Sequence, residues 1–451
     1  MKVCKFGGSS VADAKQIKKI LNIINNDAAR KYIVVSAPGK RHNKDVKVTD
    51  LLIALVEAVT YRKDYQELIS QILERFLQIE RELDIRHSLI ETFRTQLNDY
   101  IVRYQDQSER LTDALKSCGE DFNAQLIARC NNELGIMTTY LSPGDIGLIV
   151  SDEPSNAIVL EESYEKIKNN LAHTEGKVII PGFFGVNKNG DINTFSRGGS
   201  DITGAIIASS VSSDVYENFT DVSGIFSADP NIVDHPASVI QLTYEEMREL
   251  SYAGFSVFHD EALLPVYRSQ ILVNIKNTND PDHPGTLITN TRQSTGVVGV
   301  SCDTGFASIN MKKYLMNREI GFTRRLLSIL EDMNISYEHM PSGIDDISVI
   351  LRAHQLEGKE GKEVKLLEKI EQELKVDALS IEKNIAILMV VGLGMKTLVG
   401  TANKATEAFK AHNINLKMIN QGSSEISMMF GIEEKDADQA VLAAYEAYFT
   451  H

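Results

Sequence analysis

The sequence lacks several features that would assign it to whole classes of proteins. Its four cysteines lie far apart and show no C-x-x-C spacing, so neither a zinc site nor a disulfide framework is indicated, and a reducing cytosol fits best. No stretch approaches the ~18 uncharged apolar residues of a membrane span, and the first residues lack the apolar core of a signal peptide. We therefore expect a cytoplasmic chain that is neither exported nor membrane-spanning.

Basic residues are also in the minority. Lys and Arg number 47 against 62 Asp and Glu, a formal net charge of −15, and no local basic cluster offsets it. We therefore expect no nucleic-acid or anionic-membrane partner. Apolar residues make up 43% of the chain, which is ordinary for a soluble globular protein, and 451 residues predict two to four domains at roughly 150 residues each.

The first part of the chain alternates short apolar runs with helical spacing, as in layered α/β domains. Lys2–Phe6 predicts a strand that runs directly into two glycines, and Val11–Ile24 predicts the helix that follows. Tyr32–Ser36 is a continuous apolar run, which predicts a strand buried on both faces, as is typical of a parallel sheet. Similar buried strands are predicted over Ile146–Val150, Lys177–Pro181 and Val215–Thr220.

A stretch without glycine or proline interrupts this alternation. From Asp50 to about Cys118 the chain is rich in Glu, Gln, Arg and Leu, and its apolar residues recur at helical spacing. The pattern predicts several helices in succession, with residues 60–118 forming an insert packed on the sheet. An arm that moves over the active site or meets another subunit is the alternative.

The C-terminal third contains an internal repeat. Asn334-Ile335-Ser336 recurs 79 positions later as Asn413-Ile414-Asn415, and Asp346-Ile347-Ser348 recurs at the same offset as Glu425-Ile426-Ser427. Each copy predicts strand, helix, strand, loop, strand, helix, so we place a boundary near Gln293 and expect a small α/β sandwich used twice. The predicted first helices of the two copies are Phe322–Met333 and Val399–His412.

Two motifs place glycines at predicted helix starts. Lys5-Phe6-Gly7-Gly8-Ser9-Ser10 allows backbone N–H groups to approach a phosphate, although its lysine precedes the glycines and it is not a P-loop. In Ser196–Asp201, Arg197 offers a carboxylate clamp and Asp201 an acid that orders a lysine or a metal. A plain tight turn for the first motif, and a helix cap with a surface ion pair for the second, are the alternatives.

A third motif follows the predicted strand that ends at Thr220. It runs from Phe219 to Pro230 and so lies at the carboxyl end of that strand, where open α/β sheets bind ligands.

In order and spacing, the three motifs resemble those of the aspartokinases in the amino-acid-kinase superfamily. The repeat resembles that family's paired ACT domains, which bind regulatory amino acids, and the helical stretch after Thr49 resembles the monofunctional, lysine-sensitive branch. The resemblance covers essentially the whole chain. It implies an α/β amino-acid-kinase fold, a three-layer αβα sandwich over residues 1–293, followed by two ferredoxin-like ACT domains over 294–380 and 381–451, with exchange of strands between them left open.

The resemblance further implies an activity. It is the phosphorylation of the β-carboxylate of L-aspartate by ATP and Mg²⁺, which gives 4-phospho-L-aspartate and opens the diaminopimelate pathway to lysine, threonine and methionine. Feedback inhibition by lysine through the ACT domains is implied, with threonine, or both amino acids together, as the alternative, and a homodimer or homotetramer is expected. A kinase acting on another amino acid or a carbamate, and a non-catalytic amino-acid sensor, are the alternative functions.

The resemblance also implies the residues of each site. Those implied for catalysis are Lys5, Gly8, Gly199 and Asp201. Those implied for aspartate are Thr49, Glu120 on the ammonium group, Phe183, Arg197 on the α-carboxylate, Ser200 and Asp201. Those implied for ATP are Lys5, Gly7, Gly8, Ser9, Ser36, Thr220, Asp221, Phe226, Asp229, Pro230, Asn231 and Ser256. Those implied for the effector are Gly321, Phe322, Met340, Ser342, Gly343, Ile344, Asp345 and Asp346.

Two positions depart from the family pattern. The family commonly carries an Arg and a Lys where this chain has Asn231 and Ser256, so we expect different nucleotide contacts on that side. No protein metal site is implied, because Mg²⁺ would be held mainly by the ATP phosphates.

Overall fold

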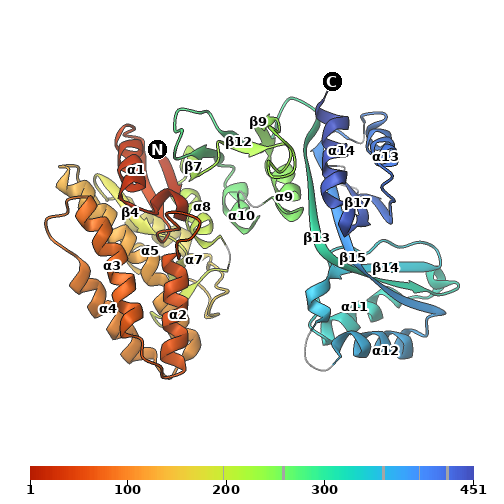
Figure 1. Ribbon diagram of the computed structural model, residues 1–451, viewed down its shortest axis with the longest axis horizontal. Helices are drawn as coiled ribbons and strands as arrows, with labels where there is room; N and C mark the ends of the chain where they lie inside the picture. The colour runs from red at the N-terminus through yellow and green to blue at the C-terminus, as the bar shows by residue number, and fades with distance from the viewer. Residues whose placement is uncertain are drawn as a thin grey trace. The chain divides into compact units, whose positions relative to one another are not determined.

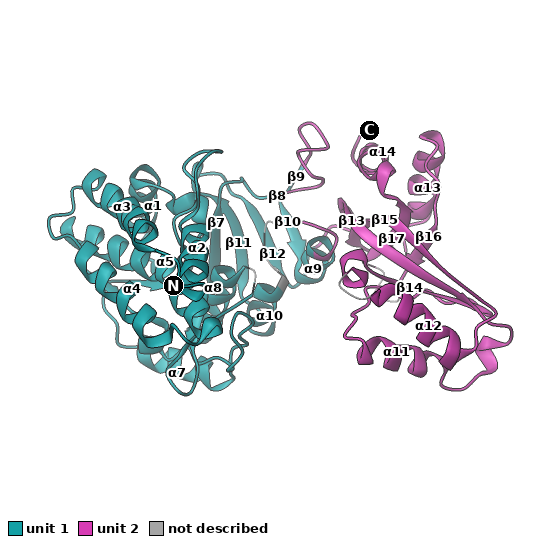
Figure 2. Cartoon of the chain, turned by 60° about the horizontal axis from the view of Figure 1, so that its bottom comes forward, with its two compact units in different colours: residues 1–225, 238–251, 256–292 teal, residues 226–237, 252–255, 293–451 magenta. Residues whose placement is uncertain are grey.

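The structure is a computed structural model that describes residues 1–196, 198–255, 258, 260–357, 361–395, 397–422 and 426–450. Within these residues the chain forms two compact units (Figure 2). The first contains Met1–Ile225, Ser238–Ser251 and Ser256–Arg292, and the second contains Phe226–Ala237, Tyr252–Phe255 and Gln293–His451. None of the described helices has the length and apolar character needed to cross a membrane.

The central sheet of the first unit brings several strand ends to one edge (Figure 1). In the described residues its order is β10-β12-β11-β7-β1-β2-β4-β3, and the neighbours β7, β1, β2 and β4 run parallel. Phe6 is the register partner of both Val35 and Phe219, so the residues that follow these strands emerge together. The strands are β1 (Lys2–Phe6), β2 (Arg30–Val35), β3 (Thr138–Tyr140), β4 (Lys177–Pro181), β7 (Val215–Thr220), β10 (Gln241–Thr243), β11 (Leu272–Asn277) and β12 (Thr286–Thr289).

Helices cover both faces of this sheet. Successive side chains of β1 point to opposite faces: Cys4 and Phe6 join an apolar core shared with α1 and α5, whereas Lys5 points toward α8. The three-layer α/β class predicted from the sequence is therefore confirmed. The helices of the first unit used below are α1 (Ala14–Asn25), α2 (Val48–Thr60), α3 (Gln66–Glu82), α4 (Ile90–Tyr104), α5 (Ser108–Glu133) and α8 (Gly199–Ser210).

The stretch free of glycine and proline forms α2, α3, α4 and the start of α5, which runs on to Glu133. An aromatic cluster joins these helices, because Phe93 stacks on Phe122 with ring centroids 4.1 Å apart and Phe76 meets both rings edge-on. The same apolar core continues to β2 and β4 through Val35 and Ile179. The helices are thus one layer of the first unit.

Two local predictions are wrong. The helix expected from Val11 begins at Ala14, because Gly8–Val11 forms a 3₁₀ turn and Asp13 caps α1 by accepting the Gln16 N–H. The strand expected over Ile146–Val150 is instead the short helix α6 (Pro143–Ile146), followed by isolated bridges at Ile149 and Val150. A Ser142 capping box with Pro143 at the first helical position starts α6, and Gly147, with φ of 80°, ends it.

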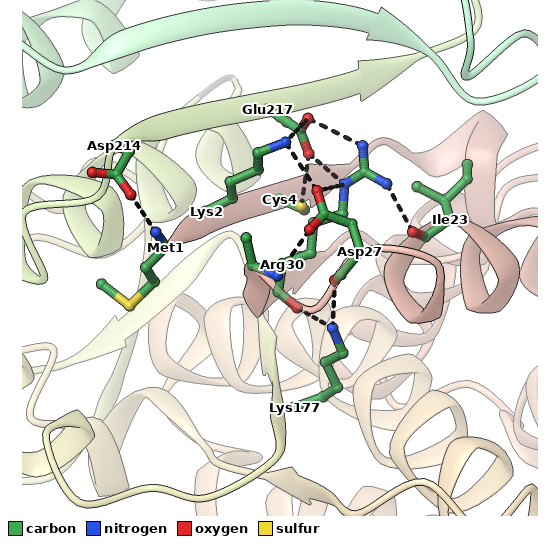
Figure 3. A network of polar contacts seen from close by, with 10 residues as sticks. Met1, Lys2, Cys4, Ile23, Asp27, Arg30, Lys177, Asp214 and Glu217 are labelled. Atoms are coloured by element: carbon green, nitrogen blue, oxygen red, sulfur yellow. Dashed lines mark hydrogen bonds and ion pairs between the residues drawn. The ribbon is translucent and has the colours of Figure 1, made fainter.

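A network of charged groups ties the amino-terminal ends of β1, β2 and β7 together (Figure 3). The buried Glu217 carboxylate accepts a hydrogen bond from Arg30 Nε at 2.6 Å and pairs with Lys2 Nζ at 3.4 Å. Burial alone would raise the pKa of Glu217, but hydrogen bonds from Arg30 and the nearby positive charges lower it. The network lies at the opposite ends of the strands from the glycine motifs, and we assign it to stability.

The second unit is built on one antiparallel sheet, with the described order β14-β13-β15-β17-β16. The long strands β13 and β15 pair with each other, so the two copies of the repeat share a sheet. The segment 226–237 belongs here, because Ala228 and Val233 join the core around Leu388. The elements are β13 (Gly296–Lys312), α11 (Phe322–Asp332), β14 (Asp346–Arg352), α12 (Lys362–Leu374), β15 (Ala378–Leu393), α13 (Thr401–Ala411), β16 (Met418–Gln421), β17 (Ser427–Glu433) and α14 (Ala437–Phe449).

The repeat is visible in the backbone. Gly321 and Gly400 precede α11 and α13 with φ of 80° and 87°, and Asn334 and Asn413 follow them with φ of 51° and 55°. Left-handed residues thus delimit both helices at the same offset. The strand expected before β14 is reduced to isolated bridges at His339 and Ser342, since the intervening Pro341 has no N–H to donate to a ladder.

Candidate active site

A buried ion pair marks the edge of the sheet where the glycine motifs meet. Lys5 Nζ lies 2.7 Å from Asp201 Oδ1, and their side chains are only 10% and 14% exposed. Asn218 Nδ2 donates to the same carboxylate oxygen at 2.6 Å, and the Tyr216 hydroxyl donates to the Asp201 carbonyl at 3.1 Å. The pair forms because β1 and β7 are neighbours and α8 packs across them. Asp201 is therefore held in place and orients the Lys5 ammonium group.

The loop after β1 is closely packed against the loop after β2. Gly39 N–H donates to Gly8 C=O at 2.9 Å, and a Cβ atom at Gly39 would lie 2.7 Å from the Gly8 carbonyl carbon. Ser36 N–H donates to Phe6 C=O at 3.1 Å, which places Ser36 at the same edge. Gly7 is close to the lysine, because a Cβ atom there would lie 3.4 Å from Lys5 Nζ. Only a glycine fits at Gly39, and its backbone shapes the predicted phosphate loop.

The beginning of α8 is packed against the loop after β4. A Cβ atom at Gly199 would lie 2.9 Å from Phe183 Cα, and one at Gly182 would lie 2.6 Å from Ser200 Oγ. Phe183 itself has φ of 78°, an uncommon conformation for a bulky residue, and its N–H donates to Thr203 Oγ1 at 3.1 Å. Arg197 lies outside the described residues.

Glu120 lies on the other side of the same strand ends. Its side chain is buried on α5, and within the described residues its Oε2 atom has no hydrogen-bond partner. Burial raises the pKa of Glu120 to about 8, opposed by a hydrogen bond with the Ala37 backbone and by the charge of Lys116. Thr49, the second residue of α2, is half-buried. A buried carboxyl group with one unpaired oxygen atom is suited to receive a cationic group of a ligand.

The predicted nucleotide residues fall into separate parts of the structure. Thr220 ends β7, where its carbonyl accepts the Thr278 N–H at 2.9 Å, and the following Asp221 is exposed. In the second unit, Asp229 Oδ1 accepts the backbone N–H of Asn231 at 2.8 Å. Phe226, Asp229, Pro230 and Asn231 belong to that second unit. Ser256 lies outside the described residues.

Three of the predicted effector residues line a groove in the second unit of about 420 Å³. Its lining includes Ser342, Gly343 and Asp346, together with Lys417. Asp345 instead accepts the Leu315 N–H at 2.8 Å, so it caps a turn. Gly321 and Phe322 begin α11, and Met340 and Ile344 flank the groove residues in the chain.

Several residues of this region have no counterpart in the sequence motifs. Asn218 holds Asp201, Gly39 touches Gly8, and Lys116 lies one helical turn before Glu120. Asn218 could have been found from the sequence, because it is a polar residue inside a strand that was predicted to be buried. Gly39 and Lys116 carry no local signal, because their positions depend on contacts between distant segments. No group of three or more His, Cys, Asp or Glu side chains that could hold a metal ion occurs in the described parts of the chain.

Comparison with known proteins agrees with this geometry. Residues 1–277 match the Amino acid kinase family, and residues 388–448 match an ACT domain. Aspartokinase 3 of Bacillus subtilis is 49% identical over 451 residues, which cover 100% of this chain and 99% of that protein. The chain belongs to the amino acid kinase family, and within it to the aspartokinases.

Solved aspartokinases share the fold. The crystal structure of Clostridium acetobutylicum aspartate kinase is 40% identical, superposes with a TM-score of 0.83, and the match covers 99% of this chain and 100% of that one. E. coli aspartokinase III in complex with aspartate and ADP is 24% identical with a TM-score of 0.80, over 100% of both chains. The predicted enzyme class and the ACT regulatory module are thereby confirmed.

Proposed function

We propose that this aspartokinase transfers the γ-phosphoryl group of ATP to the β-carboxylate of L-aspartate, which yields ADP and 4-phospho-L-aspartate. The buried pair of Lys5 and Asp201 at the shared edge of β1, β7 and α8 is the observation that carries the proposal. It supplies an oriented cation beside two glycine loops, which suits the transfer of a phosphoryl group between anions.

The reaction requires that the two substrates be positioned, and it requires no proton transfer by the enzyme. A β-carboxylate is ionised at neutral pH, so its attack on phosphorus needs no general base. The enzyme must instead hold the two anions in line and offset their repulsion. The positive charge of Lys5 offsets the repulsion, and the Asp201 carboxylate, which pairs with Lys5, holds the ammonium group in place. Asp201 already accepts hydrogen bonds from Asn218 and pairs with Lys5, so it orients the lysine and takes no proton.

The start of α8 adds to this charge complementarity. Gly199 begins a helix of 12 residues, whose first N–H groups and positive dipole end suit the transferring phosphoryl group. Gly8 begins only a 3₁₀ turn of four residues, so it contributes close backbone approach rather than a helix dipole.

The aspartate site is assigned to α5, α2 and the Phe183 loop. Glu120 would accept the substrate ammonium group, which supplies the partner that its Oε2 atom lacks in the described residues. Thr49, Phe183 and Ser200 would line the site, and Arg197 would bind the α-carboxylate.

The nucleotide is assigned to the loops after β1, β2 and β7. Gly7, Gly8, Ser9 and Ser36 would contact the phosphates, and Mg²⁺ would be held mainly by phosphate oxygens. The residues assigned to the adenosine side are Thr220, Asp221, Phe226, Asp229, Pro230, Asn231 and Ser256.

Regulation is assigned to the second unit. Lysine is proposed as the inhibitor, and Asp346 in the groove would bind its side-chain ammonium group. We assign residues 1–293 to the kinase domain and 294–380 and 381–451 to two ACT domains in a cytoplasmic homodimer or homotetramer.

A coupled assay of ADP formation tests the activity. The purified chain, with ATP and Mg²⁺, is given L-aspartate, L-glutamate or no acceptor. ADP formation that depends on aspartate supports the proposal. Dependence on glutamate would assign another amino-acid substrate, and no acceptor-dependent ADP formation would favour a non-catalytic sensor.

A further inference from the structure

Lys116 lies near the proposed aspartate site and has no anionic partner among the residues that the structure describes. It lies on α5, is half-buried, and its Nζ atom is 5.2 Å from the centroid of the Phe183 ring. Among the described residues it forms no hydrogen bond or ion pair, and it interacts with Phe183 through this cation–π contact. A half-buried ammonium group with only a ring beside it retains the capacity to bind an anion.

Glu120 lies four residues after Lys116 on the same helix, and the two side chains do not pair in the described structure. Residues four apart on a helix lie on one face, where a lysine and a glutamate commonly pair. Here they do not, because Glu120 Oε2 has no partner in the described structure and Lys116 is directed to Phe183. A carboxyl group and an ammonium group therefore lie one helical turn apart on α5 and form no ion pair with each other in the described structure.

The Phe183 ring connects Lys116 to the reacting residues. Phe183 follows β4 and packs on Gly199, where a Cβ atom would lie 2.7 Å from Phe183 Cδ2. Gly199 is two residues before Asp201, which holds Lys5. Lys116 thus lies beside the loop that faces the start of α8.

An amino acid is a zwitterion, with an ammonium group and an α-carboxylate on one carbon atom. A carboxylate and an ammonium group one helical turn apart complement this pattern, since charge-assisted hydrogen bonds are the strong ones. We propose that Lys116 binds the α-carboxylate of the substrate, in addition to the role predicted for Arg197, while Glu120 binds its ammonium group. The inference rests on the proposed function and adds a specificity-determining residue to it.

The electrostatics of the pair support this role. The positive charge of Lys116 lowers the pKa of Glu120, against the larger effect of burial. Lys116 therefore also favours the ionised form of Glu120, which is the form that binds an ammonium group.

Lys116→Met tests the proposal, because methionine keeps an unbranched side chain against Phe183 and removes the charge. Loss of one charge-assisted contact is expected to raise the KM for aspartate about tenfold, with kcat and the KM for ATP changed less than about twofold. Lys116→Arg should stay close to wild type. Lys188→Met, at an exposed lysine paired with Glu162, is the matched control.

A substrate analogue separates direct binding from an effect through Glu120. The α-amide of aspartate keeps the ammonium group and lacks the α-carboxylate charge. Direct binding predicts that wild type discriminates against the amide more strongly than Lys116→Met does, by about the same tenfold. Equal weakening of aspartate and amide in the variant, or an unchanged KM for aspartate, would overturn the inference. Wild-type enzyme without aspartate-dependent turnover would instead contradict the proposed function.

Discussion

The Lys5 ammonium group and the Asp201 carboxylate form a buried ion pair with an N–O distance of 2.7 Å. One partner comes from the first strand and the other from a helix that begins almost two hundred residues later. Breaking a buried pair leaves an uncompensated charge. The two residues therefore act as one unit, and substitution of either should disturb the chemistry more than the binding of substrate.

Lys5→Ala and Arg197→Ala should affect different kinetic constants. Loss of the Lys5 ammonium removes charge stabilisation of the transferring phosphoryl group and should lower kcat about 10³-fold, with little change in the KM for aspartate. Loss of the Arg197 guanidinium should mainly raise the KM for aspartate. Steady-state kinetics with both substrates varied would measure this, and the reverse pattern would contradict the assigned roles.

Asn218→Ala should lower kcat about tenfold, because it removes the amide that donates to Asp201 at 2.6 Å. The Lys5 and Asp201 charges both remain, so the effect is on their orientation. The KM for aspartate should change little. A kcat equal to that of the wild type would show that Asp201 needs no support from β7.

The KM for aspartate should depend on pH through Glu120. Burial raises the pKa of this carboxyl group to about 8, so it is largely protonated at pH 6 in the free enzyme. Because an ammonium group binds the ionised form, the KM should fall as the pH rises toward about 8 and then level off. The variant Glu120→Gln should show a high KM without this dependence. A flat wild-type profile between about pH 6 and 8 would contradict the assignment.

The same pKa shift predicts a change in stability. A carboxyl group whose pKa is raised on folding favours the folded state most at low pH, and that contribution is lost as the pH rises from about 4.5 through about 8. Thermal melts of the wild type and Glu120→Gln should therefore diverge across this range, with the variant relatively more stable at the upper end.

Asp113→Ala should lower the free energy of unfolding by about 3 kcal/mol. The buried Asp113 carboxylate accepts the N–H groups of Ser155 and Thr194, both at 2.8 Å, on one oxygen and their hydroxyls on the other. Alanine removes the acceptor of both N–H groups and both hydroxyls. Urea titration measures the loss, and Asp106→Ala, at an exposed position, should leave the midpoint unchanged.

Much of the fold was accessible from sequence because its signals are local. The segments that became β1, β2, β4 and β7 are rich in apolar residues, and glycines follow or precede them where the loops need space. The strand predicted over Ile146–Val150 failed because a capping box and a left-handed glycine outweighed apolar content. Hydrophobicity alone does not separate these outcomes.

The site was less accessible where it depends on distant contacts. Asn218 donates a hydrogen bond to Asp201, which lies on α8. The role proposed for Lys116 depends on its contact with Phe183 and on the unpaired Oε2 atom of Glu120 in the described structure. The membership of residues 226–237 in the second unit follows from packing around Leu388, for which no local pattern exists. Tertiary contacts, rather than local propensity, decide these features.

The most direct test of the central claim is aspartate-dependent ADP formation by the purified chain with ATP and Mg²⁺, measured beside Lys5→Ala. We predict turnover with L-aspartate, little with L-glutamate, and a product that reacts with hydroxylamine as an acyl phosphate does. We also predict that Lys5→Ala loses this turnover. Equal ADP formation with and without aspartate, or undiminished turnover in Lys5→Ala, would contradict the account.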